Sequence, residues 1–111
     1  MTSVPERDWK VFTRIHPGAL DRFCKRVLEE VDAIAKDESK SFHERYLAIY
    51  KLIQREDKEM ANVFNDYRRS TAFWQIGIMY THGLLTEEEF MQFTPETRNA
   101  IAALQEVRGE E

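Results

Sequence analysis

The stretch that most constrains the fold is residues 70–86, STAFWQIGIMYTHGLLT, the longest run of the chain without Asp, Glu, Lys or Arg. At about 100° per residue, its apolar side chains between Phe73 and Tyr80 fall on all sides of a helix instead of on one stripe. Such a helix has to be covered on every face. It is too short and too polar for a membrane span, which needs about 20 mostly apolar residues. The cover must therefore be protein, either the rest of the chain or a second copy.

The size and composition predict a single soluble domain. The chain has 111 residues, of which 42% are hydrophobic, enough for one core. Its net charge of -4 does not favour a dedicated nucleic-acid or anionic-membrane binder, although a local basic patch remains compatible with it. The single cysteine, Cys24, forms no internal disulfide, and the opening MTSVPERDWK has no apolar signal core. We expect a cytoplasmic protein over residues 1–111, with a frayed tail at 109–111.

Two helices are predicted before the polar loop at residues 36–40. A short one over residues 5–15 follows from apolar side chains that recur every three residues. Pro17 and Gly18 then predict a break, with the proline in the first turn of a second helix. That second helix, over residues 18–36, has an apolar stripe spaced by four and three: Leu20, Cys24, Val27, Val31 and Ile34.

A long helix is predicted over residues 42–67. Ser41 and Glu44 fit a capping box, which places the first helical residue at Phe42. A seam of residues spaced by four and three follows, and its spacing resembles that of a coiled coil. The seam consists of Phe42, Tyr46, Ile49, Ile53, Glu56, Met60, Val63 and Tyr67. The helix is either continuous or bent near Glu56.

The central apolar stretch is predicted to form a helix with Ser70 as its N-cap and Gly83 just past its end. A second capping box at residues 86–89 predicts a short helix to about Phe93. Residues 94–96, Thr-Pro-Glu, open the last helix. Its buried edge is expected at Ile101, Leu104 and Val107.

These segments predict an all-α fold, a small bundle of four main helices plus one or two short helices, since no segment shows sustained period-two alternation. The two ends of the chain carry opposite charge. Residues 7–26 have six Lys or Arg and two acids, whereas residues 86–111 have two Lys or Arg and seven acids. A basic face can therefore meet an acidic one, within one subunit or between two.

The sequence has no motif for catalysis or metal binding. His16, His43 and His82 are far apart and lack the carboxylate three residues before them that di-iron bundles use. Cys24 lies on an apolar helix stripe, where a thiol is protonated and inert. The acidic groups fit solvated helix faces and helix N-termini. We expect no enzyme, no cofactor and no metal.

One pair of residues departs from this pattern. Arg68 and Arg69 precede the predicted start of the central helix, where the macrodipole disfavours cations. One interpretation is a phosphate or carboxylate site made of Arg68, Arg69 and Ser70, with Trp74 as a stacking surface. The favoured alternative is that the arginines pair with Asp66 or with acids of a partner, and that Trp74 is part of the core.

The interpretation that fits best is a protein-interaction module that first binds itself. Seven Phe, four Tyr and two Trp, together with the seam and the central helix, exceed what one thin bundle buries. We expect a twofold homodimer that packs through the seam or through the central helix. The expected interface or stacking residues are Tyr46, Met60, Tyr67, Trp74 and Tyr80.

Three alternatives stay open. One is a second, different protein as the partner. Another is a nucleic-acid-associated regulator that uses Arg68, Arg69 and the basic segment 7–26. The third is a small-ligand pocket near Trp74 and Tyr80.

Overall fold

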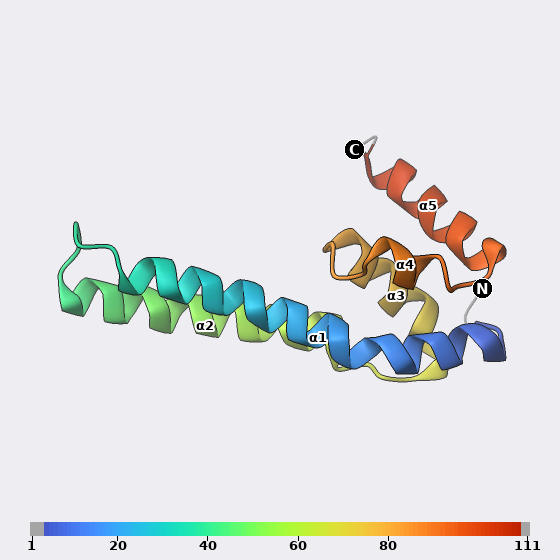
Figure 1. Cartoon of the computed structure of the whole chain (residues 1–111), viewed down its shortest axis with the longest axis horizontal. Coiled ribbons are helices and arrows are strands. Elements are labelled where there is room, and N and C mark those ends of the chain that lie inside the picture. The colour runs from blue at the N-terminus through green and yellow to red at the C-terminus, as the bar shows by residue number, and fades with distance from the viewer. Residues whose placement is uncertain (1–3, 110–111) are drawn as a thin grey trace.

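The chain folds into a helical head from which a two-helix hairpin protrudes (Figure 1). This computed structural model describes the backbone of residues 4–109 and the side chains of residues 4–105. The helices are α1 (Glu6–Ala35), α2 (Phe42–Phe64), α3 (Ala72–Thr81), α4 (Glu87–Phe90) and α5 (Pro95–Gly109). The predicted all-α class with four main helices is confirmed, since the described residues contain no strand. The molecule is 52 Å long and 23 Å across its narrowest direction.

We call residues 24–62 of the hairpin the arm, and the rest of the described chain the head. In the head, α3 packs against α1, α2 and α5, and α5 lies on the side of α3 and α4 that faces away from α1 (Figure 1). The hydrophobic core lies there. Its fully or nearly fully buried members include Phe12, Val63, Ile76, Phe93 and Ile101.

α1 is a single helix of 30 residues that passes through Pro17, so the predicted break at Pro17-Gly18 is wrong. A proline inside a helix removes one backbone hydrogen bond and costs about 3 kcal/mol. Side chains buried on both sides of Pro17 offset this cost. They are Val11, Phe12 and Ile15 before it and Ala19 and Phe23 after it.

The turn at the tip of the arm forms as predicted. The Ser41 hydroxyl accepts from the Glu44 N–H at 3.1 Å, and the Glu44 carboxylate accepts from the Ser41 N–H at 2.9 Å. Arg45 donates to the carbonyl of Ala35 at 2.8 Å and so ties α2 to the end of α1. α2 is continuous, but it ends at Phe64, with Asn65 as its C-cap. The predicted end at Tyr67 is therefore three residues too late.

The start of the central helix differs from the prediction. A 3₁₀ turn over Arg69–Thr71 precedes α3, and Thr71 is its N-cap, so Ser70 does not cap the helix. The cause of this difference is a turn formed by residues 66–71, which immediately precede α3. The Thr71 hydroxyl donates to the carbonyls of Asp66 and Arg68, at 2.9 and 3.1 Å, and holds residues 66–71 in a tight turn.

The end of α3 follows the prediction. Gly83 has a φ of 67°, the left-handed conformation that glycine adopts without a steric penalty. Its N–H donates to Tyr80, and the Leu84 N–H donates to Met79 at 2.9 Å, the pair of bonds of a Schellman motif. Leu84 is fully buried over this last turn.

Of the two sources of cover that the sequence left open for the central helix, the rest of the chain covers most of its side chains. Phe73, Ile76 and Met79 are at most 6% exposed within one subunit. α1, α2 and α5 all contact α3 and supply that cover. Ile78 is partly buried, and Trp74 is 50% exposed.

α4 is shorter than predicted, and α5 begins where the sequence indicated. The capping box of Thr86 and Glu89 is present, but α4 ends at Phe90, and residues 91–93 form a turn that buries Phe93. α5 begins at Pro95, and Ile101 is buried as expected. The Val107 side chain and the tail residues 110–111 lie outside the described residues.

A buried carboxylate, Asp8 on α1, holds the start of α5. Its two oxygens accept from the Thr94 N–H at 2.8 Å, from the Thr94 hydroxyl at 2.8 Å and from the Thr97 hydroxyl at 2.6 Å. Asp8 and Thr97 are both fully buried. The cap of the last helix thus depends on a residue more than eighty positions earlier in the sequence.

The opposite charges of the two chain ends meet within one subunit. Arg22 of α1 donates to both carboxylate oxygens of Glu89, at 2.6 and 2.9 Å, and to the carbonyl of Leu84 at 2.6 Å. The Arg22 guanidinium holds the pKa of the Glu89 carboxyl below its usual range. This ion pair fixes α4 against α1.

His16 lies, partly buried, in a cluster of aromatic rings. Its ring lies 4.6 Å from that of Tyr67 and 5.4 Å from those of Phe12 and Phe64, measured between centroids. Its Nε2 atom is buried without a hydrogen-bond partner. Burial lowers the pKa of the imidazole below its usual value, so this site favours the neutral ring.

We expect Asp8→Ala to lower the free energy of unfolding by about 2–4 kcal/mol, because it leaves buried donors of Thr94 and Thr97 without an acceptor. Asp8→Asn retains one acceptor and should cost less. Thermal and urea denaturation followed by circular dichroism measure both variants. The matched control is Glu38→Ala in the exposed tip loop, which should leave the midpoint unchanged. Equal midpoints for Asp8→Ala and Glu38→Ala would contradict the anchoring role.

We expect stability to fall as the pH drops below about 6.5, the usual pKa of histidine. The unfolded chain then takes up a proton that folded His16 resists, because burial lowers its pKa. Above this pH both states are neutral, and the effect is absent. Urea titrations between pH 7.5 and 5 should show a shallower decline for His16→Phe than for the wild type, and equal slopes for the two proteins would contradict the role of His16.

Candidate functional site

The interior of the arm is thin. Among its side chains, all within the described part of the chain, Leu52 alone is buried, at 4% exposure. Val27, Val31, Ile34 and Ile49 are partly buried between the two helices. The arm therefore has much less apolar burial than the head, although its sequence includes twelve large apolar residues.

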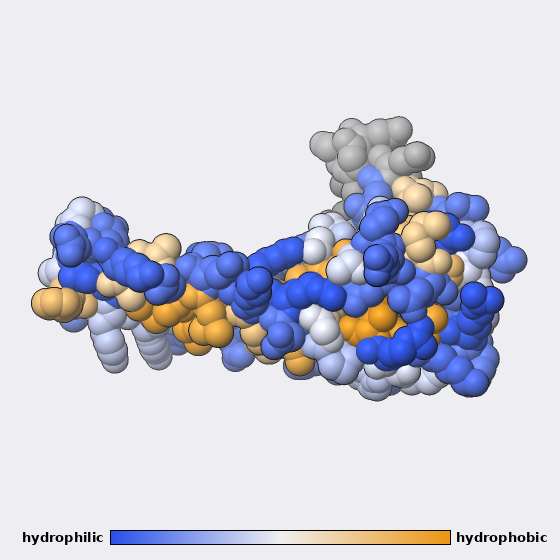
Figure 2. Space-filling model, in the orientation of Figure 1, coloured by the Kyte–Doolittle hydropathy of each residue, from blue (hydrophilic) through white to orange (hydrophobic). Residues whose placement is uncertain are grey.

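The large apolar side chains that the arm does not bury form an exposed apolar surface, which we call the arm face. Phe42 is 83% exposed, Tyr46 68% and Leu28 63%. On α2, the positions 42, 46, 53 and 60 fall within about 40° of one another at 100° per residue. The arm face consists of Cys24 and Leu28 of α1 and Phe42, Tyr46, Tyr50, Ile53 and Met60 of α2. Figure 2 shows hydrophobic residues running along the arm.

The base of the arm face is hollowed. A cavity of about 200 Å³ opens between α1 and α2, with Cys24, Leu28, Ile53 and Met60 in its wall. A shallow groove continues from it along α1. The carboxylates that border the cavity and the groove are Asp21, Glu29, Asp32, Glu56 and Asp57, and the cation among the lining residues is Lys25. This hollow is apolar inside and acidic around its edge.

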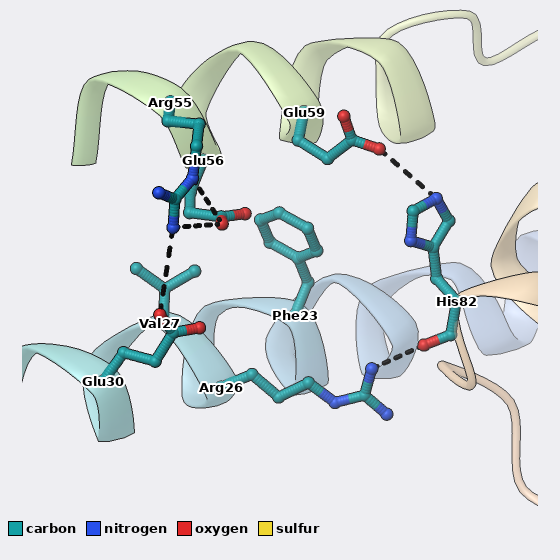
Figure 3. Close-up of a pocket in the computed structure, with 8 residues that line it drawn as sticks. All are labelled: Phe23, Arg26, Val27, Glu30, Arg55, Glu56, Glu59 and His82. Atoms are coloured by element: carbon teal, nitrogen blue, oxygen red, sulfur yellow. Dashed lines mark hydrogen bonds and ion pairs between the residues drawn. The ribbon is translucent and has the colours of Figure 1, made fainter. Parts of the chain in front are cut away.

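The other side of the hairpin carries a polar cleft of about 360 Å³ at the junction of arm and head (Figure 3). Phe23 and Val27 of α1 form its apolar part. Glu59 of α2 lies 3.3 Å from the His82 imidazole at the end of α3. Arg26 donates to the carbonyl oxygens of His82 and Gly83.

The charges in the cleft are paired with one another. Arg55 contacts Glu56 at 3.3 Å and Glu30 at 3.9 Å. Within the described residues, no group of three or more His, Cys, Asp or Glu has the geometry to hold a metal ion. The contacts of Arg26 and Glu59 join the arm to the head, so the cleft acts as a brace at the base of the arm.

The predicted anion-binding residues lie in the 3₁₀ turn and just before it. Arg68 pairs with Asp66 at 2.6 Å, and Arg69 pairs with Glu6 at 2.7 Å. The pairing lowers the pKa of Asp66. Ser70 is exposed. Both guanidinium groups thus already have carboxylate partners. The pairing of Arg68 with Asp66 is the one that the alternative interpretation expected. An anion site at Arg68, Arg69 and Ser70 stays a prediction.

The basic segment 7–26 is partly engaged within the subunit. Arg22 pairs with Glu89, Arg26 donates to backbone carbonyls of the α3–α4 turn, and Arg14 donates to Gln92. These contacts turn several of its cations towards the head. A nucleic-acid patch on this segment remains a prediction without a structural observation that favours it.

The five predicted interface or stacking residues lie in four places. Tyr46 and Met60 belong to the arm face. Tyr67 packs beside Trp9, Phe12 and His16 in the head. Trp74 contacts Phe73 and lines a small hollow with α5, while Tyr80 stacks on Phe90 with ring centroids 4.2 Å apart. Trp74 and Tyr80 thus lie in different surroundings, one beside α5 and the other on α4.

The exposure of Leu28 and Tyr50 is the feature of the arm face that the sequence analysis did not indicate. These side chains are 63% and 50% exposed, whereas Ile53, which is 43% exposed, belongs to the seam that was expected as one interface. The sequence does contain one indication of this exposure. The apolar stripe on α2 is wider than the surface that a single neighbouring helix covers. The acids around the hollow were interpreted as solvated pairs, because no sequence pattern shows that they border an apolar cavity.

Comparison with protein-family models, with curated proteins and with solved structures finds no match for this chain. Among the described residues, no helix has both the length and the apolar composition that crossing a bilayer requires.

A pair of neighbouring residues on α2 tests the assignment of the arm face. We expect Leu52→Ala to lower the free energy of unfolding by about 2–4 kcal/mol, the usual cost of truncating a buried leucine. Ile53→Ala should cost less than about 1 kcal/mol, because the side chain is 43% exposed. Urea denaturation followed by circular dichroism measures both. A larger loss for Ile53→Ala than for Leu52→Ala would contradict the assignment.

Proposed function

We propose that this protein is a protein–protein interaction module whose binding surface is the arm face, and that its first partner is a second copy of the chain. The observation that carries the proposal is the contiguous row of large apolar side chains that one subunit leaves exposed. Monomeric proteins rarely expose apolar patches of this size unless the patch binds something.

The area of the arm face supports a stable association. Five of its side chains, Leu28, Phe42, Tyr46, Tyr50 and Ile53, are between 43% and 83% exposed. At about 150–250 Å² for a fully accessible aromatic side chain and somewhat less for an aliphatic one, they contribute roughly 600 Å² of accessible surface. A stable complex buries about 800 Å² on each partner, so these residues with their immediate neighbours are sufficient.

The composition of the surface favours a protein partner. Tyrosine and phenylalanine are enriched at the centre of protein interfaces, where charged residues are depleted. Tyr46, Tyr50 and Phe42 lie at the middle and tip of the arm face, while the charges lie at its edge. A cytoplasmic location is part of the proposal, supported by the free thiol of Cys24.

A second copy is the simplest partner because a straight apolar stripe on a helical hairpin is self-complementary under a twofold rotation. Two hairpins packed through such stripes form a four-helix bundle, in which each helix gains the neighbours that it lacks in the single arm. The thin interior around Leu52 would then become the centre of a full core.

We expect light scattering coupled to size-exclusion chromatography to give the mass of a dimer at micromolar concentration. Ile53→Asp and Tyr46→Asp should each raise the dissociation constant at least about tenfold, because each buries a carboxylate in an apolar interface. The circular dichroism spectrum of each variant should match that of the wild type.

The control is Ala48→Asp, which introduces the same charge at an exposed position on the same helix, about 140° away from Ile53. It should leave the dissociation constant unchanged. A wild-type protein that stays monomeric at several hundred micromolar would contradict the proposed self-association. Equal effects of Ala48→Asp and Ile53→Asp would contradict the arm face as its site.

A further inference from the structure

The two ends of the arm face differ in shape. At the tip, Phe42 and Tyr46 are 83% and 68% exposed, so their rings project from the surface. At the base, Leu28, Ile53 and Met60 surround the cavity of about 200 Å³. A cavity of about 150 Å³ is large enough to hold a benzene ring. The arm face therefore carries projecting rings at one end and a hollow of matching size at the other.

The two ends also differ in charge. Five carboxylates and one lysine border the hollow and its groove: Asp21, Glu29, Asp32, Glu56, Asp57 and Lys25. Asp32 pairs with Lys36 and Glu56 with Arg55, which leaves three carboxylates against Lys25 among the lining residues. The tip, residues 37–45, has three acids and two cations, Asp37, Glu38, Glu44, Lys40 and Arg45. The excess of carboxylates is therefore larger at the base of the arm than at the tip.

We infer that two copies pair through their arm faces in antiparallel orientation, so that the tip of each arm covers the hollow of the other. This inference rests on the proposed self-association and specifies its geometry. One twofold rotation inserts the rings of both tips into both hollows. A parallel pairing would instead set hollow against hollow, which leaves a void, and carboxylates against carboxylates, which repel one another.

The length of the arm fits this arrangement. Tyr46 and the middle of the hollow, between Ile53 and Met60, are about ten residues apart, or about 15 Å along α2. The twofold axis then crosses α2 near Lys51. Phe42 reaches the level at which the partner's head begins, so the whole arm face is covered and the two heads lie at opposite ends of a four-helix bundle.

Distances between spin labels at the tip and the base distinguish the two orientations. Cys24→Ala removes the native thiol, and either Glu38→Cys at the tip or Asn62→Cys at the base supplies one label site, both at exposed positions. In the antiparallel dimer, pulsed electron paramagnetic resonance should give a tip-to-tip distance above about 30 Å. Mixed dimers of the two labelled proteins should give a tip-to-base distance below about 20 Å.

The outcomes separate this inference from the proposed function. Long tip-to-tip and short tip-to-base distances support both. A dimer with short tip-to-tip and long tip-to-base distances overturns the antiparallel orientation and leaves self-association intact. A wild-type protein that remains monomeric overturns both. Because Cys24 lines the hollow, the Cys24→Ala background must dimerise with the wild-type dissociation constant; if it does not, Cys24→Val, which refills the wall, replaces it.

Discussion

The continuity of α1 across Pro17 is the constraint on which the rest of the structure depends. One uninterrupted helix contributes Val11, Phe12 and Ile15 to the head and then forms one side of the arm. If the chain broke at Pro17, the direction of the arm relative to the head would depend on a loop. Because the helix passes through, the direction of the arm follows from α1 itself, and α2 returns along it to bring Val63 and Phe64 back into the core. In the proposed self-association, a surface on such an arm would be ordered before it binds, so less conformational entropy would be lost.

Local sequence patterns predicted the features that depend on neighbouring residues. The capping boxes at Ser41 and Thr86 and the left-handed Gly83 each need a few adjacent positions, and all three are confirmed. Two of the features that the sequence did not predict depend on distant contacts, and a third is local. Pro17 stays helical because buried side chains on both sides of it pack into the core. The cap at Ser70 is lost to a local bond, from the Thr71 hydroxyl back to the carbonyl of Asp66 five positions earlier. The anchor of α5 at Asp8 joins residues 86 and 89 positions apart, and no periodicity or motif indicates such a pair.

The division of burial between the two apolar stretches was the hardest property to predict. Both the central helix and the seam on α2 have more apolar surface than one thin bundle covers, and the sequence does not say which of them the subunit covers itself. The subunit covers α3 itself, since α1, α2 and α5 all pack against that helix. The seam receives one neighbour, α1, which contacts the side of α2 near Leu52 and leaves Tyr46, Tyr50 and Ile53 exposed. The candidate site is therefore the part of the apolar surface that remains after the head has been packed, and identifying it requires the tertiary structure.

The two sides of the arm have complementary tasks. On one side, Arg26 and Glu59 contact the end of α3 and brace the base of the hairpin through polar groups that already have partners. On the other side, the large apolar side chains of the arm face have no packing partner within the described part of the subunit except the opposite helix of the hairpin. If both sides of the hairpin packed against the head, no surface would remain for binding. If neither side did, binding would cost the conformational entropy of ordering the arm. Because the polar side makes the contacts with the head, the apolar side is held in place and stays exposed, and the proposed interaction surface requires both.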